Sequence, residues 1–288
     1  MSLSLAGKVC LVTGGTSGIG RATAEGLAAR GARVLLPSRD LARGQGIAAE
    51  LARASGGQVQ ALACDLASQA SIRACVAALL EQESRLDVLV NSAGIVAYTR
   101  RETQEGLEAT FGVTYLGAYL LTRLLVPLLR QSAPARVVNV AGEFHRKARL
   151  DFEDLQLERS YNVIRAGAQA MLCKILFSFE LARRLEGSGV TVNCLHPGAV
   201  QSGLLRSLPW YLRFPAALAT PFLQSPAQGA RTPLYLACDP SLAETSGLYF
   251  AKEKPFEPSP MAQERETQAR LWRVSAELTG LRPELETP

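Results

Sequence analysis

The sequence predicts an α/β fold, a doubly wound parallel sheet in a single domain. Short runs of β-branched and aliphatic residues alternate six times with longer stretches rich in Ala, Leu, Arg and Glu. This alternation implies βαβ units, which place helices on both faces of a parallel sheet. With 288 residues, 48% of them hydrophobic and 20% charged, the chain can bury such a core without disulfides or metal.

The apolar pattern defines each predicted element in turn. The predicted strands are residues 9–12, 33–36, 59–63, 86–90, 136–140 and 190–195. The predicted helices are residues 19–30, 41–54, 68–83, 102–130 and 158–186, which contain many good helix formers. No linker interrupts this pattern, so we predict one domain over residues 1–280 and a frayed, polar tail over residues 281–288.

Composition and charge argue against several kinds of partner and location. The net charge is +5, but the basic residues are scattered, so no nucleic-acid surface is predicted. The apolar run 214–223 contains two prolines and is shorter than the roughly 20 residues of a membrane span, so we predict no transmembrane segment. Residues 1–8 show no secretory signal, and we expect a cytoplasmic protein.

Cysteine and histidine usage argues against a metal centre. The six cysteines are widely spaced without a C-x-x-C pair, and several lie in apolar runs, which predicts buried free thiols. The chain has only two histidines, His145 and His196, so we predict no metal site.

Residues 203–225 interrupt the regular pattern with large apolar side chains and three prolines. We interpret them as a lid over a pocket for a hydrophobic small molecule. Two alternatives stay open: ordinary core packing, or a peripheral membrane contact in which Arg206 and Arg213 flank the aromatic residues.

A glycine-rich segment, residues 14–20, follows the first predicted strand and begins the first predicted helix. Glycines at this place let the backbone turn tightly and approach a pyrophosphate, which is attracted to the free N–H groups of the helix N-terminus. A strand before the segment and a helix after it favour a dinucleotide site over an ordinary βα turn, and hence a Rossmann fold.

The spacing T-G-x-x-x-G-x-G resembles that of the short-chain dehydrogenase/reductase superfamily. Further matches are Asp65-Leu66, residues 91–94 (N-S-A-G) and Pro197-Gly198, and several segments are similar to the retinol-dehydrogenase-like branch. The resemblance implies dinucleotide contacts at Gly14, Thr16, Ser17, Gly18, Ile19, Gly20, Asp65, Leu66, Asn91, Ala93, Gly94, Pro197 and Gly198.

Two arginines favour NADP(H) over NAD(H). Sites that prefer NAD(H) carry an acidic residue at the end of the second strand, whereas a 2′-phosphate requires cations. This chain has Arg39 there and Arg21 after the glycine segment. The alternative is that both are ordinary surface charges.

The catalytic residues that the resemblance implies are not present at their expected places. The family uses Ser and Tyr at the carbonyl, a Lys four residues after the Tyr, and an Asn that completes a proton relay. Thr114 stands at the place of the Asn, Gly142 at that of the Ser, Gly167 at that of the Tyr and Met171 at that of the Lys. We therefore assign no catalytic residue.

Other side chains near these places are candidate proton donors. They are Tyr98, Tyr115, Glu143 and His145, each of which also has an ordinary structural interpretation. On the following turn of the same predicted helix, we expect Cys173 to pack in the core and Lys174 to face solvent.

Three functions are consistent with these observations: a pseudoenzyme that binds NADP(H) without turnover, an atypical oxidoreductase or redox-neutral rearrangement enzyme, and an ordinary retinoid or steroid carbonyl reductase. The lost residues disfavour the third, and fold alone does not establish function. Because related proteins dimerise through the helices that correspond to residues 102–130 and 158–186, a homodimer is also compatible with the resemblance.

Overall fold

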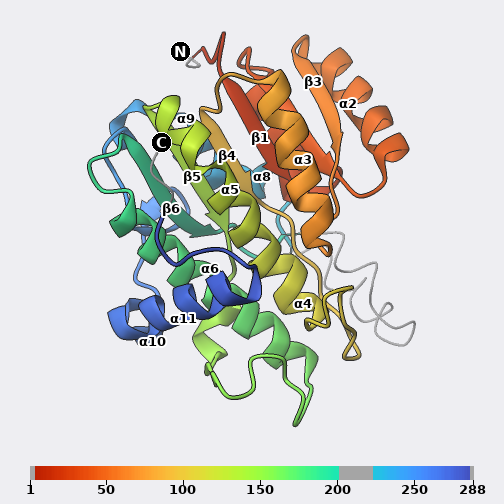
Figure 1. Ribbon diagram of the computed structural model, residues 1–288. Helices are drawn as coiled ribbons and strands as arrows, with labels where there is room; N and C mark the ends of the chain where they lie inside the picture. Colours follow the sequence, from red (N-terminus) through yellow and green to blue (C-terminus); the bar gives the residue numbers. More distant parts are fainter. Residues whose placement is uncertain (1–3, 201–222, 286–288) are drawn as a thin grey trace.

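In the described residues, 4–200 and 223–285 of a computed structural model, eight strands form one sheet in the order β3-β2-β1-β4-β5-β6-β7-β8 (Figure 1). The strands are β1 (Val9–Thr13), β2 (Arg33–Ser38), β3 (Gln58–Ala63), β4 (Val88–Asn91), β5 (Ala135–Val140), β6 (Val190–His196), β7 (Tyr249–Ala251) and β8 (Lys254–Pro255). Strands β1 to β7 are parallel, and β8 is antiparallel to β7. The predicted doubly wound α/β class is confirmed.

Helices cover both faces of the sheet. One face packs against α1 (Gly18–Ala28), α2 (Leu41–Ser55) and α9 (Arg231–Cys238). The other packs against α3 (Gln69–Gln82), α5 (Gly117–Gln131), α6 (Val163–Arg184) and α11 (Arg265–Leu278). Short helical turns complete the described chain: α4 (Ala109–Phe111), η1 (Gly112–Leu116), η2 (Glu143–Lys147), α8 (Pro226–Gly229), η5 (Pro240–Leu242) and α10 (Pro260–Gln263). Two apolar clusters result, one on each face.

Two predicted helices begin later than expected. The helix predicted from residue 102 begins at Ala109, because Glu108 accepts hydrogen bonds from the amides of Thr110 and Phe111 (2.8 Å each) and caps it. The helix predicted from residue 158 begins at Val163, where Asn162 caps the amides of Ile164 and Arg165. A capping side chain satisfies N–H groups that have no partner within the helix, so it fixes where the helix starts.

The segment Ala109–Gln131 is long and apolar enough, by length and composition alone, to cross a membrane. The sequence prediction overlooked this segment. In the structure, 83% of its most apolar window is buried inside the protein, among α3, α6 and the sheet. This degree of burial is that of a core helix.

The predicted lid, residues 203–225, lies almost entirely outside the described residues. The chain on either side of residues 201–222 meets in a parallel bridge between Val200 and Gln224, and the Gln224 amide donates to the Ala199 carbonyl (2.8 Å). The residues just before and just after this segment therefore lie next to each other, beside Gly198.

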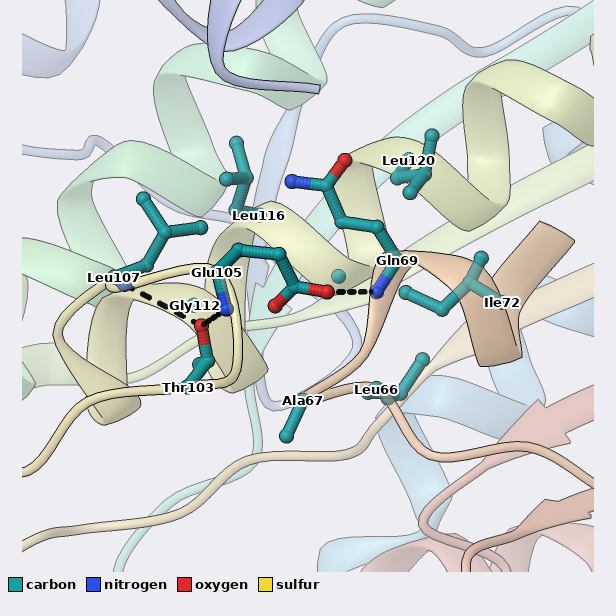
Figure 2. Close-up of a pocket in the computed structure, with 11 residues that line it drawn as sticks. Leu66, Ala67, Gln69, Ile72, Thr103, Glu105, Leu107, Gly112, Leu116 and Leu120 are labelled. Carbon is teal, nitrogen blue, oxygen red and sulfur yellow. Dashed lines mark hydrogen bonds between the residues drawn. The ribbon is translucent and has the colours of Figure 1, made fainter. Parts of the chain in front are cut away.

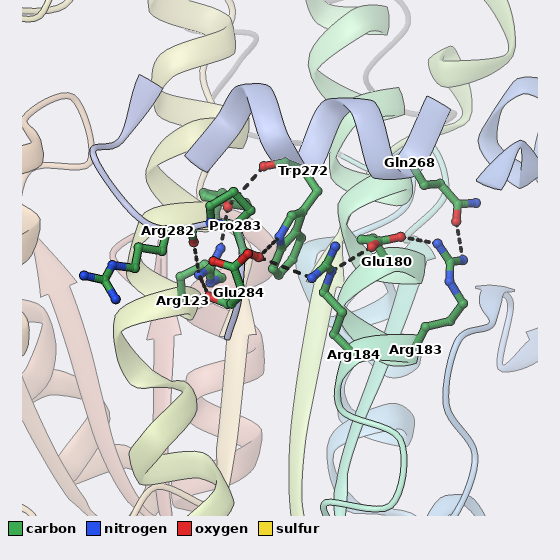
Figure 3. A network of polar contacts seen from close by, with 10 residues as sticks. Arg123, Glu180, Arg183, Arg184, Gln268, Trp272, Arg282, Pro283 and Glu284 are labelled. Atoms are coloured by element: carbon green, nitrogen blue, oxygen red, sulfur yellow. Dashed lines mark hydrogen bonds and ion pairs between the residues drawn. The ribbon is translucent and has the colours of Figure 1, made fainter. Parts of the chain in front are cut away.

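The C-terminal segment lies against α5 and α6 and is bound there by two arginines (Figure 3). Arg123 on α5 donates to the carbonyls of Arg282 (2.8 Å) and Glu284 (2.7 Å), and Arg184 on α6 donates to that of Pro283 (3.2 Å). We expected residues 281–288 to fray. That expectation is wrong for the described part, residues 281–285, whose carbonyls are held by these charged donors.

Trp272 on α11 is the centre of this contact. The guanidinium carbons of Arg123 and Arg184 each lie 4.5 Å from the indole centroid, and the indole N–H donates to the Pro283 carbonyl (2.6 Å). The ring also packs against Tyr119 of α5 and Phe177 of α6. Because Trp272 is only 1% exposed, it joins α11 to the core.

Replacing this indole tests its contribution to stability. We expect Trp272→Ala to lower the free energy of unfolding by about 3–5 kcal/mol, as for other buried aromatic residues, measured by chemical denaturation. The control is Phe144→Ala, because Phe144 is 58% exposed and its removal is expected to change stability by less than about 1 kcal/mol. Equal effects of the two substitutions would contradict this account of the C-terminal contact.

Candidate functional site

A crevice for a ligand is expected where the strand order reverses, between β1 and β4 at their carboxyl ends. The turn after β1 lies directly against the segment that follows β4. The Ala93 amide donates to the Thr13 hydroxyl (3.1 Å), and a Cβ placed on Gly14 would lie 2.9 Å from the Ala93 Cα. Gly14 also has φ +69°, so both its conformation and its surroundings require glycine.

The predicted phosphate loop forms the entry to α1. Ser17 occupies the N-cap position without a side-chain cap hydrogen bond, and the first turn contains no acidic residue. Gly20 packs on the loop so closely that a Cβ there would lie 2.4 Å from the Gly14 carbonyl oxygen. The structure thus brings Gly14, Thr16, Ser17, Gly18 and Ile19 together around a helix N-terminus, which suits an anion.

The two predicted arginines differ in their surroundings. Arg21 forms an ion pair with Glu50 of α2 (2.8 Å), in which both side chains are exposed. Arg39 is exposed directly after β2 and has no ion pair within the described part of the chain. Of the two, Arg39 therefore offers a guanidinium that carries no compensating carboxylate.

Asp65 and Leu66 follow β3 on the same edge of the sheet. The Asp65 carboxylate accepts from the Ala67 amide (3.0 Å), which fixes the turn. Figure 2 shows Leu66 on the wall of a shallow recess between the start of α3, residues 103–107 and α5. There the Gln69 amide donates to the Glu105 carboxylate (2.7 Å), and the other lining side chains are largely apolar. The only carboxylate among the residues that line the recess is that of Glu105.

Asn91 does not offer its side chain to the crevice. The side chain is buried, and its amide nitrogen donates to the Thr122 hydroxyl and to Asn139 Oδ1 (2.8 Å each). Its role is to join β4 to α5 and β5. A ligand at residues 91–94 would therefore contact backbone groups, or Ala93 and Gly94, and not the Asn91 side chain.

Pro197 and Gly198 lie at the end of β6, and His196 fixes their turn. His196 Nδ1 accepts from the Gly198 amide (3.1 Å), while its Nε2 faces the Glu143 carboxylate (3.1 Å), which also binds Arg146. Burial lowers the pKa of His196, although Glu143 opposes this shift. The neutral ring, protonated on Nε2, thus ties the turn after β6 to the loop after β5.

The four positions at which the resemblance implies catalytic side chains lie around one end of α6. They are Thr114, Gly142, Gly167 and Met171. A Cβ on Gly142 would lie 3.5 Å from the Met171 sulfur, and Met171 is one helical turn after Gly167. A Cβ on Gly167 would meet no atom of the described residues within 4 Å. Thr114 lies in the π-helical segment η1, a feature frequent at functional sites, and its hydroxyl binds the backbone of Ile95.

Two of the candidate proton donors are engaged in the core. Tyr115 is fully buried and bonded to the Ser275 hydroxyl (2.6 Å), and burial raises the pKa of Tyr115 well above its usual value. His145 is also fully buried: its Nδ1 bonds to the Gly142 carbonyl (2.8 Å) and its Nε2 accepts from the Ser259 amide (3.0 Å). Tyr115 and His145 are therefore buried residues that hold the core together, and neither is available as a proton donor. Glu143 is exposed and Tyr98 half-buried, so only these two candidates are accessible.

Lys174 does not lie where the sequence led us to expect it. We expected it at the solvent, but its side chain is fully buried beneath the carboxyl edge of the sheet. The ammonium donates to the carbonyls of Asn91 (3.1 Å), Ala93 (3.3 Å) and Val140 (3.1 Å). The signal that could have indicated this place is the apolar run in which the lysine lies, residues 172–177. The expectation for Cys173 is confirmed, since it is buried.

Comparisons with known proteins agree with this architecture. A family model described as short chain dehydrogenase matches residues 8–151. Retinol dehydrogenase 14 of Mus musculus is 42% identical over 294 residues, which cover 96% of this chain and 86% of that protein.

Solved structures are similar over most of the chain. A crystal structure of an uncharacterized protein from Mycobacterium paratuberculosis has a TM-score of 0.80 and 30% identity, covering 99% of this chain and 97% of that one. The RhlG/NADP active-site complex of Pseudomonas aeruginosa has a TM-score of 0.70 and 30% identity, with coverages of 86% and 95%. A 3-ketoacyl-(acyl-carrier-protein) reductase from Brucella melitensis, complexed with NADH, has a TM-score of 0.66 and 27% identity, with coverages of 86% and 97%.

A pair of glycine substitutions tests the packing of the loop after β1. In Gly20→Ala the new methyl group would overlap the Gly14 carbonyl, so we expect a loss of about 1–3 kcal/mol in the free energy of unfolding. In the control, Gly46→Ala in α2, the methyl group meets nothing within 4 Å among the described residues, and a gain of about 0.5–1 kcal/mol is expected from helix propensity. Stabilisation by Gly20→Ala would show that the loop is not packed in this way.

Proposed function

Because the chain belongs to the short-chain dehydrogenase/reductase family, we propose that it binds NADP(H) at the carboxyl edge of β1 and β4 and does not perform the family's tyrosine-dependent carbonyl chemistry. The single observation that carries this proposal is that the Met171 thioether lies 3.5 Å from where a Cβ on Gly142 would be, one helical turn after Gly167, at the place where hydroxyl and ammonium groups are expected.

The cofactor half of the proposal rests on the first βα turn. The uncapped start of α1 and the glycines that bring the turn against Ala93 suit a pyrophosphate, and Asp65 and Leu66 stand where an adenine contact is expected. The similar structures were solved with NADP in one case and NADH in another. Our preference for NADP(H) rests on Arg39, an unpaired guanidinium among the described residues, because arginine binds a phosphate bidentately.

The catalytic half rests on side-chain chemistry. When bound, the nicotinamide ring supplies or accepts a hydride, and reduction of a carbonyl also requires a proton from the protein. Glycine carries no side chain that can donate one, and the methionine thioether has no proton to give. Thr114 is committed to the backbone of Ile95 through both its donor and acceptor functions. A dinucleotide at this site would therefore lack the usual path for the proton.

A second function is supported by the relatives and by the rim of the site. Curated relatives similar over nearly the whole chain bear the name retinol dehydrogenase. Glu143, half of whose side chain is exposed, lies next to Gly142 and bonds to His196, and Tyr98 is half-buried. The second candidate is thus an oxidoreductase, or a rearrangement enzyme, acting on a hydrophobic small molecule with one of these groups as proton donor.

Further parts of the proposal concern partners and location. An apolar ligand beneath residues 203–225, a peripheral membrane contact there and a cytoplasmic location remain predictions. For a homodimer through α5 and α6, the structure adds one constraint: Tyr119 and Phe177 of these helices are already covered by Trp272 of the same chain. A dimer would have to use other parts of the two helices.

Restoring the four side chains tests the proposal. We expect the wild type to leave NADPH unconsumed with a panel of aldehydes and ketones that includes all-trans-retinal. The quadruple variant Thr114→Asn, Gly142→Ser, Gly167→Tyr, Met171→Lys is expected to oxidise NADPH measurably, because the described surroundings leave space at Gly167 and ordinary contact distance at Gly142.

The matched control keeps Gly167 and carries the other three substitutions, so it lacks only the tyrosine and is expected to stay inactive. Turnover by the wild type would favour the second function, and Glu143→Gln and Tyr98→Phe would then identify its proton donor. A folded quadruple variant that binds NADPH but stays inert would show that the loss of activity does not lie in these four residues.

A further inference from the structure

Lys174 places a positive charge inside the protein. It lies in the middle of α6, and its side chain is 0% exposed. Its three N–H groups have three acceptors, the carbonyl oxygens of Asn91, Ala93 and Val140, at 3.1–3.3 Å. All three acceptors are neutral, and Lys174 takes part in no ion pair within the described part of the chain. The ammonium is therefore hydrogen-bonded but its charge is not compensated.

The three carbonyls locate this charge under the crevice. Asn91 ends β4 and Val140 ends β5, so the ammonium lies beneath the carboxyl ends of two neighbouring strands. Ala93, the third partner, is the residue on which Gly14 and Thr13 of the phosphate loop pack. Two residues after Val140 comes Gly142, which faces Met171. The charge thus lies between the phosphate loop and the place of the missing catalytic side chains.

A dinucleotide in a doubly wound fold spans the switch point with one mononucleotide on each side. Arg39 and Asp65, which suit the adenosine half, follow β2 and β3. The nicotinamide half of a bound dinucleotide would then lie over the ends of β4 and β5, near Lys174. The two oxidation states of the ring differ there by one unit of charge, since the oxidised ring is cationic and the reduced ring is neutral.

We propose that Lys174 sets the redox-state preference of the site: its buried ammonium weakens binding of NADP⁺ relative to NADPH and so makes the protein a selective binder of the reduced dinucleotide. This inference rests on the proposed dinucleotide binding. Electrostatic repulsion between the ammonium and the cationic ring acts through a protein interior that screens charge far less than water does. The same ammonium also positions the turn at residues 91–93, which would affect both forms of the cofactor equally.

The ratio of two dissociation constants separates these roles. Calorimetric titration with NADPH and with NADP⁺ at pH 7 is expected to show tighter binding of NADPH to the wild type. In Lys174→Met, which keeps the length of the side chain and removes the charge, the ratio Kd(NADP⁺)/Kd(NADPH) should fall by about fivefold to tenfold, the order expected for loss of one nearby charge. The control is Lys254→Met on the exposed strand β8, which should leave the ratio unchanged.

The pH dependence of the wild type provides the same test without a substitution. Burial lowers the pKa of Lys174 to about 8, and the neighbouring titratable group, the thiol of Cys194 on β6, stays neutral because burial raises its pKa to about 12. The ammonium is therefore present at pH 7 and is lost as the pH rises through 8. The ratio should fall towards that of Lys174→Met by pH 9.5 in the wild type, and stay constant in the variant.

Three results would overturn the inference. If Lys174→Met weakens both forms equally, the lysine is only a positioning residue of the turn. If the variant does not fold, a pH-independent ratio in the wild type leads to the same conclusion. If the wild type binds neither form, the dinucleotide proposal itself fails and this inference fails with it, whereas binding with an unchanged ratio refutes the role of Lys174 alone.

Discussion

The contact of the first βα turn with Ala93 is the constraint on which the candidate site depends. Ala93 donates to Thr13, lies against Gly14 where a side chain would overlap it, and accepts from the ammonium of Lys174. These three contacts join β1, β4 and α6 at one residue. They fix the switch point of the sheet, where a doubly wound fold forms its binding crevice. Because each contact involves the backbone of Ala93, this geometry does not depend on which side chains lie near Gly142.

Helix α6 connects this crevice with the positions at which the resemblance led us to expect catalytic side chains. One turn of the helix presents Gly167 and Met171 beside Gly142, and the next carries the buried Lys174. Lys174 thus gives this helix a buried cation three residues after Met171, the position that we assigned to the family's lysine. A group that lies beneath the sheet edge and is enclosed by three carbonyls can influence a bound cofactor through its field, but it does not reach a substrate. Such an arrangement is consistent with binding of a dinucleotide without proton transfer.

The sheet and its crossover helices could be predicted because buried parallel strands and amphipathic helices have distinct apolar periods. The tight glycine-rich turn after β1 could be predicted because close backbone approach at Gly14 and Gly20 excludes other residues. Other features depend on contacts between distant segments. Strand β7 has only three residues, and α11 is defined by the contact of Trp272 with two arginines, so neither was predicted. Lys174 was wrongly expected at the surface. Three backbone carbonyls from two strands and a loop accept hydrogen bonds from its ammonium, and the sequence does not show that they lie there.

The most direct test of the central claim is calorimetric titration of the wild-type protein with NADPH and with NADH. The account predicts binding of NADPH in the micromolar range and weaker binding of NADH, because Arg39 offers a partner for the 2′-phosphate that only the former carries. No heat of binding with either dinucleotide would contradict it. The glycine-rich turn would then be a purely architectural feature, and Gly142, Gly167 and Met171 would belong to a protein that binds neither dinucleotide.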